Sequence, residues 1–227
     1  MQFIAQQLNI VQGKVREFET KYGREENTVK LLAVSKTRSV EEILEAVECG
    51  QVEFGENYQQ EAITKIETLA PKNIVWHFIG PLQANKAQHI AKHFAWIHTV
   101  DRLKIAQRLS ILRPRDMPDL NVCVQFNVSG EPSKSGVTSG ELMPLVEEIS
   151  SLPGLRFRGL MALPAPTKDF VKQREEFCKL RQLFDELKSS GHAVDTLSMG
   201  TTNDMETAIA EGATIVRIGT ALFGARK

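Results

Sequence analysis

Leu31-Leu32-Ala33-Val34-Ser35-Lys36 is a short apolar run that ends on a lysine, and Thr37-Arg38-Ser39 then leads into a helical pattern. The run has the length and composition of a buried strand, and the polar residues after it are typical of a turn before a helix. An ammonium in an apolar setting tends to lose its proton, and a neutral amine attacks aldehydes and ketones. Lys36 is therefore either a Schiff-base lysine or a surface lysine that closes a strand.

The same succession of strand, turn and helix recurs along the chain. Several of the apolar runs are rich in Val, Ile and Phe and are bounded by Gly, Asn or Pro, as strands usually are. Strands that alternate with helices predict a parallel sheet, and eight of them favour a single (β/α)8 barrel of the TIM type over an open doubly wound sheet. The predicted strands are Val29–Lys36, Gln51–Phe54, Asn73–Ile79, Ala95–Thr99, Asn121–Val128, Leu155–Met161, Ala193–Met199 and Thr214–Ile218.

The expected helices carry capping residues at their starts. The pairs Ser39/Glu42 and Asn203/Glu206 have the spacing of capping boxes, and Asp101 is expected to cap the helix after the fourth strand. Few residues follow the last strand, so an extra amphipathic helix near the N-terminus is expected to take the place of the eighth closing helix. No Pro/Ser/Gly-rich linker divides the chain, and residues 1–227 are expected to form one domain.

Composition limits the class of protein. The 227 residues are 42% hydrophobic, and 28 basic side chains balance 28 acidic ones. Zero net charge argues against nucleic acid as the main partner, no apolar run approaches the length of a membrane span, and the N-terminus lacks the pattern of a signal peptide. Three cysteines, far apart and without a CxxC pattern, fit a reducing compartment and indicate no metal site. We expect a cytoplasmic monomer that binds neither nucleic acid nor a membrane.

In a barrel of this type, functional residues lie at the C-terminal ends of the strands, and the loops after the seventh and eighth strands commonly bind phosphate. Glycine lets the backbone approach an anion, while hydroxyls and the amides at a helix start donate to it. Here these loops contain Gly200, Thr201, Thr202, Gly219 and Thr220. The alternative is that the glycines form turns and the threonines cap helices.

Arg217 lies between two apolar residues of the eighth strand, where a guanidinium needs a partner because it stays charged. That partner is either a core carboxylate or a ring nitrogen of a ligand. Lys36 and Arg217 come from strands one and eight, which become neighbours when a barrel closes. An aldehyde-reactive amine, a phosphate cup and an arginine at one end of a barrel suggest pyridoxal 5'-phosphate.

Three further residues each have two interpretations. His77 lies in an apolar strand and is either a structural histidine or a group beside the cofactor. Asn57, after the second strand, is either a turn residue or a ligand contact. Lys134, in a polar loop after the fifth strand, is either a solvated lysine or a second amine that captures excess aldehyde or receives it from Lys36.

In these residues the chain resembles the pyridoxal-phosphate homeostasis proteins of the YggS/PROSC type, a family that is similar in fold to the barrel domain of alanine racemases. The loop after the seventh strand departs from the family pattern, because Thr201 stands where the family usually has a methionine and Thr202 where it usually has a serine, whose hydroxyl the threonine keeps. The resemblance rests on six segments in order, namely 31–37, 54–58, 76–83 with Asn85-Lys86, Ser133-Lys134-Ser135-Gly136, 158–162 and 216–220 with Phe223-Gly224.

The resemblance implies a Schiff base between pyridoxal phosphate and Lys36, with Arg217 facing the pyridine nitrogen and phosphate held around Ser198, Gly200, Gly219 and Thr220. It also implies a role in intracellular vitamin B6 and amino-acid homeostasis, and transient contact with PLP-dependent apoenzymes is a further expectation.

Two other functions remain open. One is a racemase-type enzyme, which needs an acid or base on each face of the substrate carbon. In the alanine racemases the second group is a tyrosine of an added C-terminal β domain, and we expect no such domain here. The other is an aldolase-type Schiff-base enzyme without cofactor. We expect a carrier without established catalysis.

Overall fold

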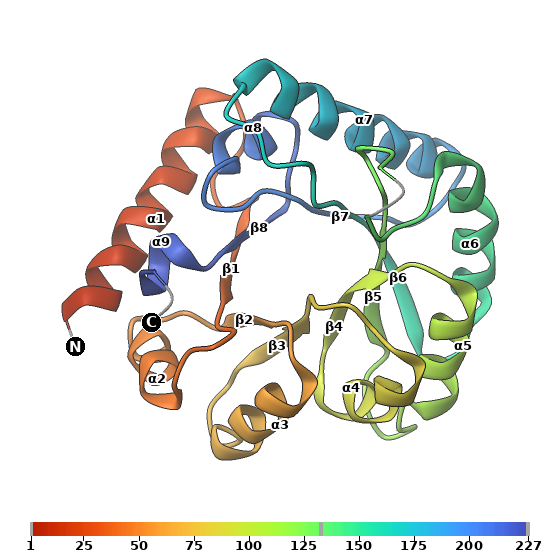
Figure 1. Ribbon diagram of the computed structural model, residues 1–227, viewed down its shortest axis with the longest axis horizontal. Coiled ribbons are helices and arrows are strands. Elements are labelled where there is room, and N and C mark those ends of the chain that lie inside the picture. The colour runs from red at the N-terminus through yellow and green to blue at the C-terminus, as the bar shows by residue number, and fades with distance from the viewer. Residues whose placement is uncertain (1, 132–133, 226–227) are drawn as a thin grey trace.

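The computed structural model describes residues 2–131 and 134–225, which form a closed barrel of parallel strands surrounded by helices (Figure 1). Neighbouring strands follow the order of the sequence and β8 pairs with β1, so the doubly wound alternative is excluded. The strands are β1 (Lys30–Val34), β2 (Glu53–Glu56), β3 (Val75–Phe78), β4 (Trp96–Val100), β5 (Leu120–Gln125), β6 (Leu155–Met161), β7 (Thr196–Ser198) and β8 (Ile215–Ile218). The helices are α1 (Gln2–Lys21), α2 (Val40–Glu48), α3 (Gln59–Thr68), α4 (Ala87–His93), α5 (Leu103–Leu112), α6 (Ser139–Ser151), α7 (Phe170–Ser189), α8 (Met205–Ala210) and α9 (Thr220–Phe223), with a 3-10 turn η1 at Ala84–Lys86.

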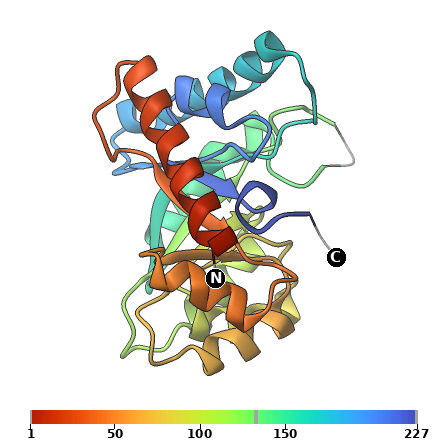
Figure 2. The ribbon, with the colours of Figure 1, turned by 90° about the vertical axis from the view of Figure 1, so that its left-hand side faces the viewer.

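Helix α1 closes the ring of helices beside β8, as the sequence predicts. The element after β8 is the four-residue α9, too short to cover the strand alone. Helix α1 packs against α2, α8 and α9 and buries Leu8, Val11 and Val15 (Figure 2). The N-terminal segment therefore supplies the apolar face that a full eighth helix would otherwise provide.

Two predicted helix caps are wrong. Helix α5 begins at Leu103 with Arg102 at its N-cap, and the Asp101 carboxylate instead accepts a hydrogen bond from Arg102 at 2.9 Å. Helix α8 begins at Met205 with Asp204 at its N-cap, so Asn203 forms no capping box with Glu206. Glu206 instead accepts from groups on α1 and just after it, Lys21 and Tyr22. In both cases a side chain expected in a capping motif bonds to another partner: Asp101 to Arg102, and Glu206 to Lys21 and Tyr22.

The capping box at the start of α2 is confirmed. The Glu42 amide donates to the Ser39 hydroxyl at 3.3 Å, and the Ser39 amide donates to the Glu42 carboxylate at 2.8 Å. This box fixes the N-cap of α2 three residues after Lys36, at the end of the barrel where β1 finishes.

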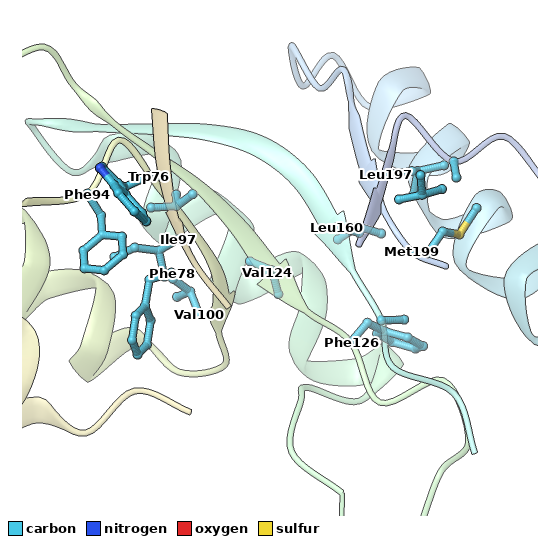
Figure 3. Close-up of a cluster of buried hydrophobic side chains, with 14 of the residues drawn as sticks. Trp76, Phe78, Phe94, Ile97, Val100, Val124, Phe126, Leu160, Leu197 and Met199 are labelled. Carbon is cyan, nitrogen blue, oxygen red and sulfur yellow. The ribbon is translucent and has the colours of Figure 1, made fainter. Parts of the chain in front are cut away.

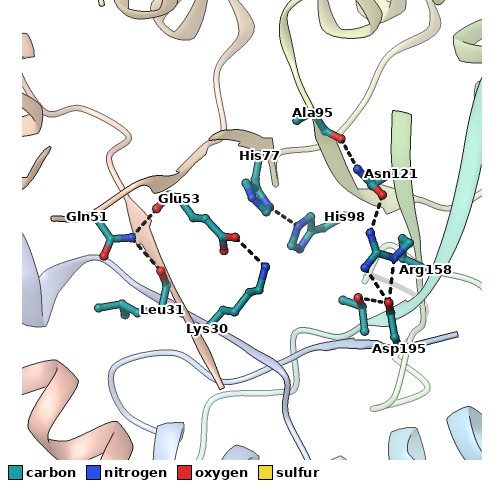
Figure 4. A network of polar contacts seen from close by, with 11 residues as sticks. Lys30, Leu31, Gln51, Glu53, His77, Ala95, His98, Asn121, Arg158 and Asp195 are labelled. Atoms are coloured by element: carbon teal, nitrogen blue, oxygen red, sulfur yellow. Dashed lines mark hydrogen bonds and ion pairs between the residues drawn. The ribbon is translucent and has the colours of Figure 1, made fainter. Parts of the chain in front are cut away.

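Alternate residues of the strands face two different environments. Trp76, Phe78 and Ile97 belong to the apolar cluster between strands and helices, which Figure 3 shows. The intervening side chains include polar groups: in Figure 4 His77 meets His98 in the buried interior of the barrel, whereas the ion pairs Lys30–Glu53 and Arg158–Asp195 are partly exposed to solvent. This polar interior lies directly below the site described next.

Within residues 2–131 and 134–225, no helix has the length and apolar character needed to cross a membrane. The same residues contain no group of three or more His, Cys, Asp or Glu side chains arranged to hold a metal ion.

Candidate functional site

Lys36 lies in a tight turn directly after β1. The Arg38 amide donates to the Ser35 carbonyl at 3.0 Å, which closes a β-turn with Lys36 at its second position. Thr37, at the third position, has φ of 62°, the left-handed conformation that a type II turn requires there. The Lys36 side chain is half-buried. The turn thus places the lysine at the C-terminal end of the barrel, as the sequence predicts.

Arg217 lies on β8, next to the strand that leads to Lys36. It pairs in register with Leu32 of β1. Its side chain is 4% exposed, and the guanidinium donates to the Ser198 hydroxyl at 2.7 Å, to the Ser198 carbonyl and to the Ala162 carbonyl at 2.8 Å. None of the ion pairs within residues 2–131 and 134–225 includes Arg217. Burial lowers the pKa of the guanidinium to about 10, so it is still charged at neutral pH.

A buried chain of hydrogen bonds runs from Arg217 across the barrel interior. The Ser198 hydroxyl lies 2.7 Å from Nδ1 of His98, and Nε2 of His98 lies 2.9 Å from Nδ1 of His77. The His77 ring stacks on Trp96 with 5.3 Å between ring centroids. Ser198, His77 and His98 have no exposed surface. The two histidines and the serine therefore lie beneath Arg217 rather than at the opening of the barrel.

Both histidines are held neutral by their surroundings. Burial lowers the pKa of His98 to about 3, and the positive charge of Arg217 shifts it in the same direction. Burial likewise lowers the pKa of His77 well below the ordinary value. Nε2 of His77 is buried and has no hydrogen-bond partner among the described residues. Neutral rings suit this place, because a second positive charge would be repelled by the Arg217 guanidinium.

The two loops predicted to bind phosphate lie side by side. The Ala221 amide donates to the Thr202 hydroxyl at 3.4 Å, which joins the loop after β7 to the start of α9. Gly200 has φ of 96°, and a Cβ there would lie 2.6 Å from Cβ of Ala208, so only glycine fits. Gly219 is at the N-cap of α9. The loop conformation thus requires Gly200 on steric grounds, whatever the loop binds.

Thr201 has a different set of partners from the one expected at a phosphate. Its amide and its hydroxyl both donate to the Asp204 carboxylate, at 2.5 and 2.7 Å. Thr202 and Thr220, in contrast, are exposed. The Thr201 hydroxyl, which the usual methionine lacks, therefore forms its hydrogen bond within the loop.

A cavity of about 750 Å³ opens beside Arg217. Gly200, Thr201 and Asp204 line one wall, and the segment between β6 and α7 that includes Lys168 lines the other. A volume of this size is ordinary for a cofactor or small-molecule site. The cavity brings the guanidinium and the loop after β7 to the same space.

Asn57 follows β2 and is half-buried, with its Oδ1 atom buried and unpartnered among the described residues. A Cβ at Gly80 would lie 2.0 Å from the Asn57 carbonyl, so the loops after β2 and β3 approach each other closely only because residue 80 is glycine. Asn57 is therefore fixed in place and has an acceptor available to a ligand.

Lys134 lies in the loop after β5, and its neighbour Ser133, part of the predicted motif, lies outside the described residues. The Lys134 ammonium is buried, 3.8 Å from the Glu131 carboxylate, without a hydrogen bond to the described residues. Asn127 donates to the carbonyls of Glu131 and Lys134, at 2.8 and 3.3 Å. The side chain is thus less exposed than that of a solvated loop lysine.

Sequence reasoning missed two parts of the site. His98 lies in a predicted strand, but the sequence alone assigns it no role. The signal that could have found it is its place on the strand next to the one that contains His77. Lys65 on α3 is 5% exposed and donates to the Ser35 carbonyl at 2.7 Å. Its spacing from Glu61 is that of an ordinary surface ion pair, so the sequence carries no signal of its burial.

Comparison with known proteins assigns the chain to a family. It matches the family described as alanine racemase, N-terminal domain, over residues 8–227. It is 53% identical over 226 residues to the pyridoxal phosphate homeostasis protein of Pseudomonas aeruginosa, an alignment that covers 100% of this chain and 97% of the relative. This chain belongs to the pyridoxal phosphate homeostasis family. The family member of Vibrio alginolyticus is 51% identical over 230 residues, with 100% of this chain and 99% of the relative covered.

A solved structure supports the same assignment. PipY of Synechococcus elongatus PCC7942, in its structure with PLP bound, superimposes on this chain with a TM-score of 0.84 at 33% sequence identity. The match covers 97% of this chain and 100% of PipY. The family resemblance noted in the sequence is thereby confirmed.

Proposed function

We propose that this chain binds pyridoxal phosphate at the C-terminal end of its barrel, holds it as a Schiff base on Lys36, and serves intracellular vitamin B6 and amino-acid homeostasis. The observation that carries the proposal is the juxtaposition of strands β1 and β8, which lead to Lys36 and contain Arg217, beside loops shaped by Gly200 and Gly219. The names of the relatives and the PLP bound to PipY support it.

The residues fit this cofactor in charge and shape. Pyridoxal phosphate supplies an aldehyde, a phosphate and a pyridine nitrogen. Lys36 supplies the amine, and Arg217 is a buried donor whose charge no carboxylate of the described residues pairs with. The cavity gives room beside the Arg217 guanidinium and the loop after β7. The unpartnered Oδ1 of Asn57, which follows the neighbouring strand β2, is a further polar contact.

Attachment and release need no oxidant or reductant. A neutral Lys36 amine would bond to the aldehyde carbon, and its two hydrogens would leave with the aldehyde oxygen as water; addition of water would reverse these changes. A reversible bond of this kind suits a protein that stores the aldehyde and hands it on. Solvent supplies the water, because Lys36 is only half-buried.

Arg217 favours a carrier over a racemase. A guanidinium only donates hydrogen bonds, so a pyridine nitrogen that faces it stays unprotonated. An unprotonated ring withdraws electrons weakly from a bound amino acid. With Arg217 charged at neutral pH, the site would hold the aldehyde without activating bystander amino acids.

The positions of the tyrosines point the same way. A racemase needs a second acid or base facing the first. The chain contains two tyrosines. Tyr22 donates to Glu206 on the outside of the barrel at 3.0 Å, and Tyr58 is 54% exposed. Neither is held in a buried position opposite Lys36, so the racemase alternative is the weaker one.

The phosphate is assigned to the paired loops, with Gly200, Thr202, Gly219 and Thr220 around it. Thr201 is left out, because Asp204 engages both its amide and its hydroxyl. Ser198 and His77 are assigned to the support of Arg217 from below, in place of a direct contact with the cofactor.

Lys134 is the second amine in this proposal. It would receive aldehyde from Lys36 or take up an excess of it before delivery to an apoenzyme by transient contact. Its ammonium has only the distant Glu131 carboxylate as a partner among the described residues. A cytoplasmic location and a monomeric state stay predictions.

An absorbance spectrum tests the proposed function. Purified wild-type protein mixed with pyridoxal phosphate should develop a visible band that borohydride removes, and Lys36→Ala should not. Lys14→Ala, a change at an exposed lysine of α1, is the matched control and should retain the band. A full band in Lys36→Ala would contradict the assignment.

A further inference from the structure

Three charged side chains surround the turn that carries Lys36. Glu56 ends β2, and Glu61 and Lys65 lie one helical turn apart on α3. Glu56 is fully buried and Lys65 is 5% exposed. Charged groups are almost never buried to this degree unless they are paired, so the cluster has a specific arrangement.

All three donors of the Lys65 ammonium are engaged. They reach the Ser35 carbonyl at 2.7 Å, the Glu56 carboxylate at 2.8 Å and the Glu61 carboxylate at 2.5 Å. An ammonium has three donors and no acceptor, so its capacity is filled. Lys65 is therefore fixed in one position, which makes it a rigid anchor.

The cluster contacts the residues on both sides of Lys36. Ser35 donates its hydroxyl to Glu56 at 2.6 Å, and its carbonyl accepts from Lys65. The Thr37 amide donates to the Glu61 carboxylate at 2.6 Å. The contacts close into a ring, from the Ser35 carbonyl through Lys65 and Glu61 to the Thr37 amide. The backbone of Lys36 completes that ring.

Thr37 needs such support. Its φ of 62° is the left-handed conformation, which a β-branched residue rarely adopts. Among the described non-glycine residues only Asn27 shares this conformation, and asparagine tolerates it far better. Threonine disfavours this backbone conformation, and the hydrogen bond from the Thr37 amide to Glu61 opposes relaxation of the turn.

We propose that Glu56, Glu61 and Lys65 act as positioning residues that hold the turn 35–38 in the conformation that presents the Lys36 amine to an aldehyde. The inference rests on the proposed function of Lys36. None of the three residues touches the cofactor in this account. They act through the backbone on either side of Lys36. Loss of a hydrogen bond in the ring is expected to let the Thr37 backbone move.

The experiment opens the ring at its most exposed member. Glu61 is 29% exposed, so Glu61→Ala should fold, whereas Lys65→Met would leave the buried Glu56 unpaired. In the apoprotein, Glu61→Ala should speed hydrogen exchange of the Thr37 amide by about tenfold or more. Schiff-base formation with added pyridoxal phosphate should slow by about tenfold, which corresponds to about 1.4 kcal/mol.

Two companion variants separate positioning from general stability. Glu61→Gln retains an oxygen that accepts from the Thr37 amide, so its rate should stay within about threefold of wild type. Thr37→Gly in the Glu61→Ala background removes the strain, since glycine adopts positive φ freely, and should restore the rate to within about threefold. Asn27→Gly in the same background is the control and should restore nothing.

Each outcome decides the proposal. A wild-type rate and wild-type Thr37 exchange in Glu61→Ala would overturn it, and so would failure of Thr37→Gly to restore the rate. If wild-type protein formed no Schiff base on Lys36, the proposed function would fail. The exchange of the Thr37 amide, measured without cofactor, would still support or refute the positioning ring.

Discussion

Acidification should destabilise this protein through the two histidines buried beneath Arg217. His98 is fully buried, and burial lowers its pKa to about 3, with the Arg217 charge adding to the shift. An imidazole in the unfolded chain has its ordinary pKa of about 6.5. Between these two values the unfolded state binds a proton that the folded state does not. Stability is therefore complete above about pH 6.5 and is lost as the pH falls below it.

The size of the effect follows from the two pKa values. Each pH unit below the unfolded pKa costs about 1.36 kcal/mol, until the folded group itself titrates. Between pH 7 and pH 5, His98 alone should lower the free energy of unfolding by about 2 kcal/mol. His77, whose pKa is also lowered by burial, adds to the loss in the same direction. Against a total of about 5–15 kcal/mol for a typical domain, this is readily measured.

Urea unfolding at pH 7 and pH 5 is the assay, with wild type compared to His98→Asn. Asparagine retains a hydrogen-bonding group that can reach Ser198 but does not titrate, so the pH-dependent loss should shrink by about 2 kcal/mol. His89→Asn, at an exposed position of α4, is the matched control and should leave the loss unchanged. If His98→Asn lost as much stability on acidification as wild type, the buried neutral histidine chain would be refuted.

Three other predictions concern the loops and the charges around the cofactor. Gly200→Ala should lower the free energy of unfolding by about 1–3 kcal/mol, because φ is 96° and the new Cβ meets Ala208. Gly13→Ala in α1, with open space around it, should raise the free energy of unfolding by about 0.5–1 kcal/mol. Urea unfolding measures both changes. Arg217→Glu should shift the absorbance of the bound cofactor, because a carboxylate accepts a hydrogen bond from a protonated pyridine nitrogen and so raises the protonated fraction of the ring; an unchanged spectrum would make Arg217 a purely structural residue. Lys134→Ala should still bind cofactor but should deliver it to an acceptor apoenzyme at an altered rate, and wild-type transfer kinetics would exclude a role for that lysine.

The barrel was predictable because its strands are bounded by strong signals. The segment Leu155–Met161 was predicted with its observed bounds, since Gly154 and a turn of proline and alanine enclose it. Strands β2 and β4 have the predicted lengths but begin two residues and one residue later, and the remaining strands are shorter than predicted, most clearly β7, which has three residues. Val194 before this strand and Met199 after it are buried, and composition alone cannot separate a strand from buried residues that flank it.

The candidate site was predictable only where chain order determines position. Lys36, Gly200 and Gly219 follow strand ends, so a barrel brings them to one end regardless of side-chain detail. The roles of His98 and Lys65 depend on contacts between elements far apart in sequence. Lys65 in particular looks like the partner of a surface ion pair, and only the packing of α3 against the end of β1 buries it.

The central claim is that Lys36 carries pyridoxal phosphate, and borohydride reduction followed by peptide mass mapping tests it most directly. Wild-type protein loaded with cofactor at one equivalent should carry the reduced label on the peptide that contains Lys36. Lys36→Ala should carry little label at the same loading. A label found mainly on Lys134 or on any other lysine of the wild-type protein would contradict the account.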